Sequence, residues 1–412
     1  MNFISKSILT AFAAAAFVFC APSLVANDVS VQSSASALIR QGILPVRVKS
    51  DNQALAGQVR AALNMHGAFS VSNPTTSSAM IVVTANPDGS MTAKGEGADP
   101  AFAGTVFVVG TPDNPDAVAK LCDEIIVAVG KKYGWKLKPL FSKTKIAFAS
   151  DRSGHKEIWW SDLRFAGKIK PLTNHRSISL APHWSPDGKR ILYTTYRSGP
   201  ADVYAVDVAT GKSSKFATYR NSNTGGDFSP DGHNVVLALS AKGPMNIYTK
   251  PASGGNAKAV CPDGSLQTCP TFSPDGKTIC FVSGATGRPS LYVVPASGGK
   301  KQRLAGTPME YSTDPDWSTV SPTKIAFSLR RGGDKIAVYD TAKKETVVLP
   351  LPRRLSNPQW CSDGRHVVAV EEGGRSRWLV LVDTEAATTP KCTRLSPASM
   401  KNCSDPATLV LK

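Results

Sequence analysis

A phrase that recurs roughly every 44 residues constrains this chain more than any other feature. An aromatic residue followed by Ser, Pro, Asp and Gly occurs in three copies, and two degenerate copies continue the series. Such even spacing is typical of repeat architectures, in which each unit is one supersecondary element. The aromatic residues that anchor the five copies are Trp184, Phe228, Phe272, Trp317 and Trp360.

Each repeated unit is expected to form four strands. The Pro-Asp-Gly segment favours a tight turn, because proline fixes φ and glycine tolerates positive φ. Apolar strand-like runs follow the turn at 190–195, 278–283 and 324–328, and further turns separate them from later strands. Four-stranded units of roughly 40 to 50 residues, repeated about six times, are the signature of a β-propeller.

The two ends of the repeat region are expected to complete one blade between them. The first unit begins at 145–149 and lacks its own Pro-x-aromatic strand, whereas the chain finishes with such a strand at 405–411. Pairing of these segments closes a ring of six blades and removes exposed strand edges. A linear solenoid, which needs capping repeats, is the alternative. We expect a six-bladed propeller over residues 140–412.

Residues 27–139 differ in composition from the repeats and predict a small α/β domain. Strand-like runs occur at 44–48, 79–84 and 105–109. Asp51 is placed to cap a helix, and a second apolar helix pattern begins at Asp116. The overall expectation is therefore a mainly β protein, with a small α/β domain before the propeller.

Residues 1–26 have the layout of a secretory signal peptide. Lys6 supplies a positive start, residues 8–19 are mostly apolar, and small residues precede a cleavage position after Ala26. The apolar run is shorter than the roughly 20 residues that span a bilayer. Lipidation at Cys20 is the alternative, although the preceding residues Val18 and Phe19 are bulky. We expect an exported mature protein.

Cysteine spacing is compatible with an oxidising compartment. Two pairs, Cys261 with Cys269 and Cys392 with Cys403, lie close enough in sequence to close short loops. The remaining cysteines of the mature chain occur within apolar patterns and are expected to be small core residues. These are Cys122, Cys280 and Cys361.

The chain is strongly basic, with a formal charge of +17. Clusters near Lys300, Arg330 and Arg353 have two interpretations: attraction to an anionic envelope polymer or acidic partner, or simple maintenance of solubility. The export signal argues against nucleic acid as the partner.

No catalytic or metal-binding pattern is present in the sequence. A G-x-S-x-G nucleophile elbow, an H-E-x-x-H zinc pattern and a Walker A loop are all missing, and the six His lack metal-ligand spacing. We therefore predict a protein that is not an enzyme and needs no cofactor. The alternative is a small-ligand or metal-binding propeller enzyme of the lactonase or lyase type.

Three segments, 145–152, 171–175 and 180–188, resemble the TolB family of periplasmic propeller proteins of the Tol–Pal envelope system. The order of signal peptide, small α/β domain and propeller also resembles that family. The resemblance implies a periplasmic scaffold between a Pal-like, peptidoglycan-associated lipoprotein and inner-membrane Tol proteins. It further implies a role in outer-membrane integrity and in constriction during cell division.

The loops that lead into the inner strands should meet on one face, around the mouth of the central channel. Their polar side chains offer hydrogen-bond donors and acceptors to a convex protein partner. The resemblance places the Pal-like lipoprotein there, and the matching residues are His183, Asn223, Thr224, Thr268, Thr313, Asp314 and Asn357. It also implies that a TolA-like inner-membrane protein contacts an N-terminal peptide containing Asn27, Asp28, Val29 and Val31.

Overall fold

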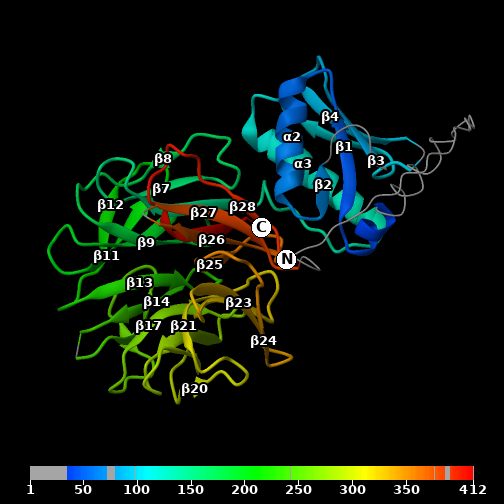
Figure 1. Cartoon of the computed structure of the whole chain (residues 1–412). Helices are drawn as coiled ribbons and strands as arrows, with labels where there is room; N and C mark the ends of the chain where they lie inside the picture. The colour runs from blue at the N-terminus through cyan, green and yellow to red at the C-terminus, as the bar shows by residue number, and fades with distance from the viewer. Residues whose placement is uncertain are drawn as a thin grey trace, which may run out of the picture.

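The computed structural model describes residues 35–71, 79–97, 99–241, 243–374, 376–385 and 390–411. In these residues a small α/β domain precedes a propeller of six four-stranded sheets (Figure 1). The predicted fold class is therefore confirmed. The predicted signal peptide and the N-terminal peptide with Asn27, Asp28, Val29 and Val31 lie outside the described residues.

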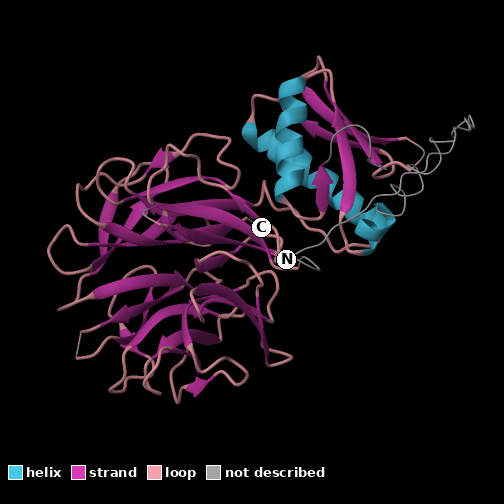
Figure 2. Cartoon of the chain, in the orientation of Figure 1, coloured by secondary structure: helices cyan, strands magenta, loops and turns pink. Residues whose placement is uncertain are grey.

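The first domain is a five-stranded mixed sheet with two helices on one of its sides (Figure 2). The strand order is β2-β1-β3-β4-β5. Asn52 caps the first helix by accepting a hydrogen bond from the Leu55 amide at 2.9 Å, so the expected cap at Asp51 is off by one residue. The elements are β1 (Leu44–Lys49), α2 (Gln53–Met65), β2 (Phe69–Val71), β3 (Ala79–Ala85), β4 (Ser90–Glu96), β5 (Thr105–Val109) and α3 (Pro115–Tyr133).

Every blade consists of four antiparallel strands, named here from the channel outward. The first two blades are β29 (Ser404–Val410), β6 (Thr144–Ser150), β7 (Glu157–Asp162), β8 (Lys170–Pro171), and β9 (Ser179–Trp184), β10 (Arg190–Thr195), β11 (Asp202–Asp207), β12 (Ser213–Ala217). The third and fourth are β13 (Asn223–Phe228), β14 (Asn234–Leu239), β15 (Asn246–Pro251), β16 (Lys258–Ala259), and β17 (Gln267–Phe272), β18 (Thr278–Ser283), β19 (Ser290–Pro295), β20 (Gln302–Arg303). The last two are β21 (Tyr311–Trp317), β22 (Lys324–Arg330), β23 (Asp334–Asp340), β24 (Glu345–Val348), and β25 (Leu355–Trp360), β26 (His366–Gly373), β27 (Ser376–Asp383), β28 (Cys392–Arg394).

The C-terminal strand β29 pairs with β6, so the first blade contains both ends of the repeat region. Ala407 lies opposite Ala147 in this antiparallel ladder. The strand is also bonded to both neighbouring blades: Trp184 Nε1 donates to the Ala407 carbonyl at 3.2 Å, and Thr408 Oγ1 donates to the Trp360 carbonyl at 2.6 Å. These contacts close the ring around its channel.

The linker between the two domains is fixed by one buried carboxylate. Asp123 of α3 accepts hydrogen bonds from the amides of Leu140, Phe141 and Ser142, at 2.9, 2.9 and 2.7 Å. Burial raises the pKa of Asp123, and these hydrogen bonds act against that rise. Leu140 and Phe141 are buried beside Ile146 and Phe148 of the propeller. The linker is therefore packed into one core shared by both domains.

A second contact between the domains centres on His366. Its Nδ1 lies 2.5 Å from Asp363 Oδ2, and its Nε2 lies 2.9 Å from the backbone carbonyl of His66 in the first domain. Because a carboxylate and a carbonyl both accept, an imidazolium donating from both nitrogens satisfies this arrangement. Burial lowers the pKa of His366, but the charge and hydrogen bond of Asp363 together with the charge of Asp383 outweigh burial and leave the pKa raised.

The cysteines do not form the two suggested pairs. All seven described cysteines, including Cys261, Cys269, Cys392 and Cys403, are free thiols. Cys122, Cys280 and Cys361 are fully buried, as expected for small core residues. Within the described residues, no helix combines the length and hydropathy needed to cross a membrane.

Candidate functional site

The wall of the channel is built from six inner strands that share one backbone irregularity. Each strand shifts register against its neighbour at a residue with positive φ. A glycine occupies this position in one blade, and other residue types adopt it in the remaining five. Such bulges redirect side chains and end regular pairing. The residues are Ala181, Gly225, Cys269, Asp314, Asn357 and Asp405.

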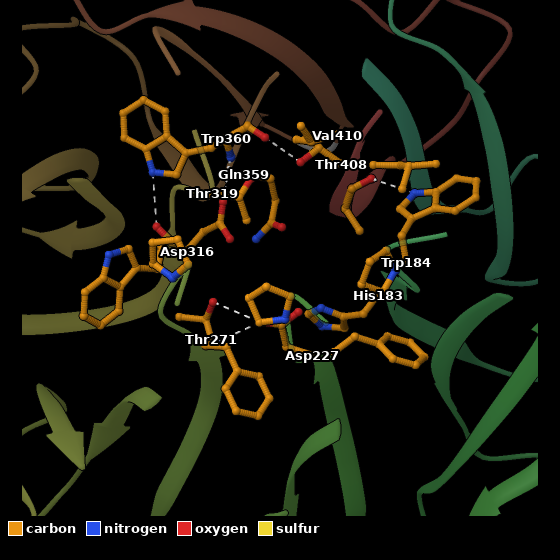
Figure 3. Close-up of a pocket in the computed structure, with 18 of the residues that line it drawn as sticks. His183, Trp184, Asp227, Thr271, Asp316, Thr319, Gln359, Trp360, Thr408 and Val410 are labelled. Carbon is orange, nitrogen blue, oxygen red and sulfur yellow. Dashed lines mark hydrogen bonds between the residues drawn. The ribbon is translucent and has the colours of Figure 1, made fainter. Parts of the chain in front are cut away.

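Beyond these bulges, on the face of the Pro-Asp-Gly turns, lies a cavity of about 470 Å³. One polar side chain from each of five successive inner strands lines it, and the C-terminal strand contributes Thr408 and Val410 (Figure 3). Prolines from three of the turns form part of its rim. The five polar residues are His183, Asp227, Thr271, Asp316 and Gln359.

Two carboxyl groups dominate the electrostatics of this cavity. Burial, with a smaller contribution from the charge of Asp227, raises the pKa of Asp316 to about 8. Burial also raises the pKa of Asp227 to about 6, although Phe272 N and Thr271 Oγ1 donate to its Oδ2 at 3.0 and 3.1 Å. Asp316 is therefore largely protonated at neutral pH. A cation entering the cavity would first have to displace this proton.

Burial alone lowers the pKa of His183 to about 4, so its imidazole is neutral at physiological pH. Its side chain lines the cavity on the turn face (Figure 3). The sequence-based assignment of His183 to the opposite mouth therefore needs correction. His183 is two residues after the bulge residue Ala181, and at this position of β9 the side chain points into the channel.

The raised pKa of Asp316 predicts a measurable pH dependence of stability. Its pKa of about 8 exceeds the unfolded value of 3.8, so the folded state binds the additional proton between these values. The free energy of unfolding should then fall as pH rises through that window. Asp316→Asn mimics the neutral acid and retains an oxygen to accept from Trp360 N, which lies 2.6 Å away. We expect urea denaturation to show the variant gaining stability relative to the parent at pH 9, compared with pH 5.

Asp187→Asn provides the control for this measurement. Asp187 belongs to an exposed turn, where a hydrogen bond from Ser185 lowers its pKa. Its titration therefore lies below pH 5 and should add no slope between pH 5 and 9. If the free energy of unfolding changes equally with pH in the parent and in Asp316→Asn, the carboxyl of Asp316 is ionised in the folded state over the whole range from pH 5 to 9.

Asn223 does not present its side chain at the channel mouth. It is fully buried, and its Nδ2 donates to the backbone carbonyls of Tyr219 and Ala201 at 2.8 and 3.2 Å. Its Oδ1 accepts from the Tyr219 amide at 3.2 Å. These bonds hold together the loop before β13, so the predicted contact role of Asn223 is replaced by a structural one.

The other predicted mouth residues lie near the starts of the inner strands, not in the loops that precede them. Asp314 accepts hydrogen bonds from Thr313 Oγ1 at 3.0 Å and from Ser328 Oγ at 2.9 Å. The backbone N–H of Asn357 donates to Ser328 Oγ at 2.8 Å, which links the fifth and sixth blades. Thr224 and Thr268 are half-buried at equivalent positions of β13 and β17. These five residues form a polar collar at the mouth.

Large exposed apolar side chains from three of the blades lie on the same face as this polar collar, and the sequence did not predict them. Leu266 is 59 % exposed immediately before β17, and Tyr311 is 47 % exposed at the start of β21. The sequence signal that could have identified them is a single large apolar residue within the polar loop before an inner strand. We call this set the apolar rim: Ile178, Tyr196, Leu266, Met309 and Tyr311.

Arginines add positive charge to the same face, but several are already paired. Arg331 bonds to Glu310 at 3.0 Å and Arg353 bonds to Glu371 at 2.8 Å. Arg330 bonds to Asp334 at 2.9 Å. Exposed ion pairs of this kind contribute little to stability. These arginines could therefore leave their present carboxylates for those of an acidic partner at little cost in free energy.

Among the described residues, the one cluster with metal-like proximity of ligand atoms lies away from the channel, at the domain contact. It consists of His66, Asp363 and His366, whose ligand atoms are all within 4.8 Å of one another. Both nitrogens of His366 are already engaged by Asp363 and the His66 carbonyl. His366 thus links the two domains, whereas both ring nitrogens of His66 are buried without a hydrogen-bond partner in the described structure.

The propeller region matches a known protein family, and short stretches of the chain match individual proteins. Residues 143–406 match the family described as the TolB beta propeller domain. A 69-residue stretch is 48 % identical to "Protein TolB homolog" of Chlorobaculum tepidum, and 42 residues are 60 % identical to "Tol-Pal system protein TolB" of a Jannaschia species. These stretches cover 16 % and 10 % of this chain, and only 15 % and 9 % of the relatives' lengths.

A solved structure extends the likeness of the fold to nearly the whole chain. The crystal structure of TolB from Acinetobacter baumannii superposes with a TM-score of 0.74, covering 90 % of this chain and 97 % of that one. The sequence identity is 18 %, so this likeness concerns the fold.

Proposed function

The chain belongs to the TolB beta propeller family, and from this premise we propose that it is a non-enzymatic scaffold of a Tol–Pal system. Its propeller mouth binds a Pal-like, peptidoglycan-associated lipoprotein, and a TolA-like inner-membrane protein binds near the N-terminal peptide. Together these contacts support outer-membrane integrity and constriction at division. The relatives named "Tol-Pal system protein TolB" support this assignment.

The observation that carries the proposal is the apolar rim on the same face as the polar collar. Five large apolar side chains are exposed on loops from several blades that all open on this face. Exposed apolar groups gathered on one face mark sites of protein association, whereas singly scattered ones do not. Aromatic anchors such as Tyr196 and Tyr311 are also the residue type that carries most of the binding energy in interfaces.

We further propose that residues 1–26 direct export to the periplasm and that residues 27–139 and 140–412 are its two domains. The lipoprotein then reaches the mouth from the outer membrane without either partner crossing a bilayer.

Loss of lipoprotein binding is the expected result of placing charge on the apolar rim. Leu266→Glu and Tyr311→Glu should each weaken binding of the purified Pal-like domain at least tenfold, because a carboxylate would be desolvated without a partner. Titration calorimetry with the mature protein provides the measurement. These side chains are exposed, so the melting temperature should stay unchanged.

Val347→Glu is the matched control, because Val347 is 60 % exposed on the outer strand β24. Binding that survives the rim substitutions, or that Val347→Glu weakens equally, would refute the mouth as the binding surface. A stoichiometric metal ion in the purified protein would instead favour the alternative of a metal-binding propeller enzyme.

A further inference from the structure

Strand β5 is an open edge of the first domain's sheet. Among the residues that the structure describes, it pairs only with β4, as the last strand in the order β2-β1-β3-β4-β5. Gly110 N donates to the Gly89 carbonyl at 2.9 Å across the hairpin, which sets the alternation of the ladder. The backbone groups of Thr105, Phe107 and Val109 consequently point away from β4, toward the free edge.

This edge lacks the devices that normally protect one. Its sequence Thr-Val-Phe-Val-Val contains no proline, charge or bulge, and Phe107 and Val109 are 57 % and 78 % exposed. Native proteins usually shorten, charge or cover such strands. Three of the six outer blade strands are short in this way, since β8, β16 and β20 have two residues each, and the five-residue β12 carries a lysine, Lys215. An edge with these properties is suited to pairing with another strand.

A groove accompanies the edge and gives it chemical selectivity. A hollow of about 540 Å³ lies between β5 and helix α3, lined by Val106 and Phe107 on one side and Val127 and Ala128 on the other. Lys131 and Lys132 lie at the end near Thr105, and Glu124 lines the groove farther along the helix. This combination of strand edge, apolar groove and helix can hold an extended peptide.

Positive charge collects at the Thr105 end of the strand edge, from Lys131 and Lys132 in the groove and from Lys94 of the neighbouring strand. Lys94 of β4 lies directly opposite Thr105 in the ladder, and Lys94 and Lys131 are both exposed. Lys132 already bonds to Asp99 and to the Pro100 carbonyl. In the described part of the chain, Lys94 and Lys131 have no ion-pair partner. An occupant with carboxylates at this end would therefore complement the groove.

We propose that β5 binds an extended segment of another protein by strand addition. The segment runs antiparallel to β5, places apolar side chains beside Phe107 and Val109, and ends with acidic residues near Lys94 and Lys131. The antiparallel direction continues the β3-β4-β5 ladder and forms the more stable type of pair. A second copy of this chain fits less well, because its formal charge of +17 opposes self-association.

The test uses the mature protein and a fluorescent peptide of sequence Thr-Val-Thr-Val-Glu-Glu. We expect saturable binding that weakens at least tenfold when the Glu residues are replaced by Lys. Binding should also weaken at least tenfold when alternate peptide nitrogens are methylated to block the ladder. Hydrogen exchange should show new protection of the Thr105, Phe107 and Val109 amides on binding.

Protein variants locate the binding site independently of the peptide chemistry. Val109→Lys and the charge reversal Lys131→Glu should each weaken the acidic peptide at least fivefold while the melting temperature is unchanged. Val347→Lys, at another exposed position, should leave binding unaffected. Equal affinity for acidic and basic peptides, no binding, or unchanged exchange at β5 would overturn the proposal.

Two further outcomes would identify a different occupant and thereby refute a separate acidic partner. Light scattering that shows a dimer abolished by Val109→Lys would indicate a second copy. Affinity for the peptide that rises when residues 27–34 are deleted would indicate that the start of this chain competes for the edge.

Discussion

Asp363→Ala is expected to lower the free energy of unfolding by about 3–5 kcal/mol, because it leaves the buried charge of His366 without its counter-charge. Asp363 Oδ2 lies 2.5 Å from His366 Nδ1, and Oδ1 accepts from the amides of Arg365 and His366 at 3.1 and 3.0 Å. Burial acts to raise the pKa of Asp363, but the charge of His366 and its hydrogen bond hold it well below the usual range. Urea denaturation at pH 6 measures the effect.

The matched control is Asp275→Ala, at the same position of the turn in another blade. Asp275 Oδ1 accepts from Ser273 Oγ at 2.6 Å and from Lys277 N at 3.0 Å, but the side chain is exposed and faces no imidazole. Loss of these hydrogen bonds should cost about 1 kcal/mol. If both substitutions cost the same, the buried pair does not stabilise the junction between the domains.

Deletion of residues 404–412 is expected to abolish cooperative folding of the propeller. It removes β29, and with it the buried side chains of Ala407 and Leu409 and the pairing partner of β6. The exposed β6 edge should then recruit other strands and produce oligomers. Circular dichroism melting and light scattering should show a broad transition and a rise in mass.

Two controls separate ring closure from a general effect of truncation. Removal of Lys412 alone should leave the melting temperature unchanged. A synthetic peptide of residues 404–411, added to the shortened chain during refolding, should restore a cooperative transition. A monomeric shortened chain with the parent's melting temperature would show that the ring does not need this strand.

The collar and the cavity show where inference from the repeat phrase ends. The phrase identifies the inner strands but not where each one begins: His183, Asn223 and Asn357 were expected in the preceding loops and lie within the strands. It does not reveal the bulge with positive φ, which turns His183 into the cavity and leaves Asn357 at the mouth. It also does not reveal that the side chain of Asn223 is buried and hydrogen-bonded to the backbone carbonyls of Ala201 and Tyr219.

The pKa values of Asp227 and Asp316 depend on tertiary structure for a related reason. Each aspartate comes from a different blade, and in sequence each stands beside an ordinary core aromatic. Burial in a shared channel raises both pKa values, and burial depends on the positions of all six blades.

The sequence by itself determined the fold class and the family, because an evenly repeated turn phrase dictates four strands per unit and the propeller follows from repetition. Tertiary structure alone decided which polar side chains are exposed, which are buried in hydrogen bonds to loop backbone, and how His366 joins the two domains. Strand formation depends on neighbours along the chain. Exposure, charge state and the contact between His366 and His66 depend on residues far apart in sequence, which only the closed ring and the docked first domain bring together.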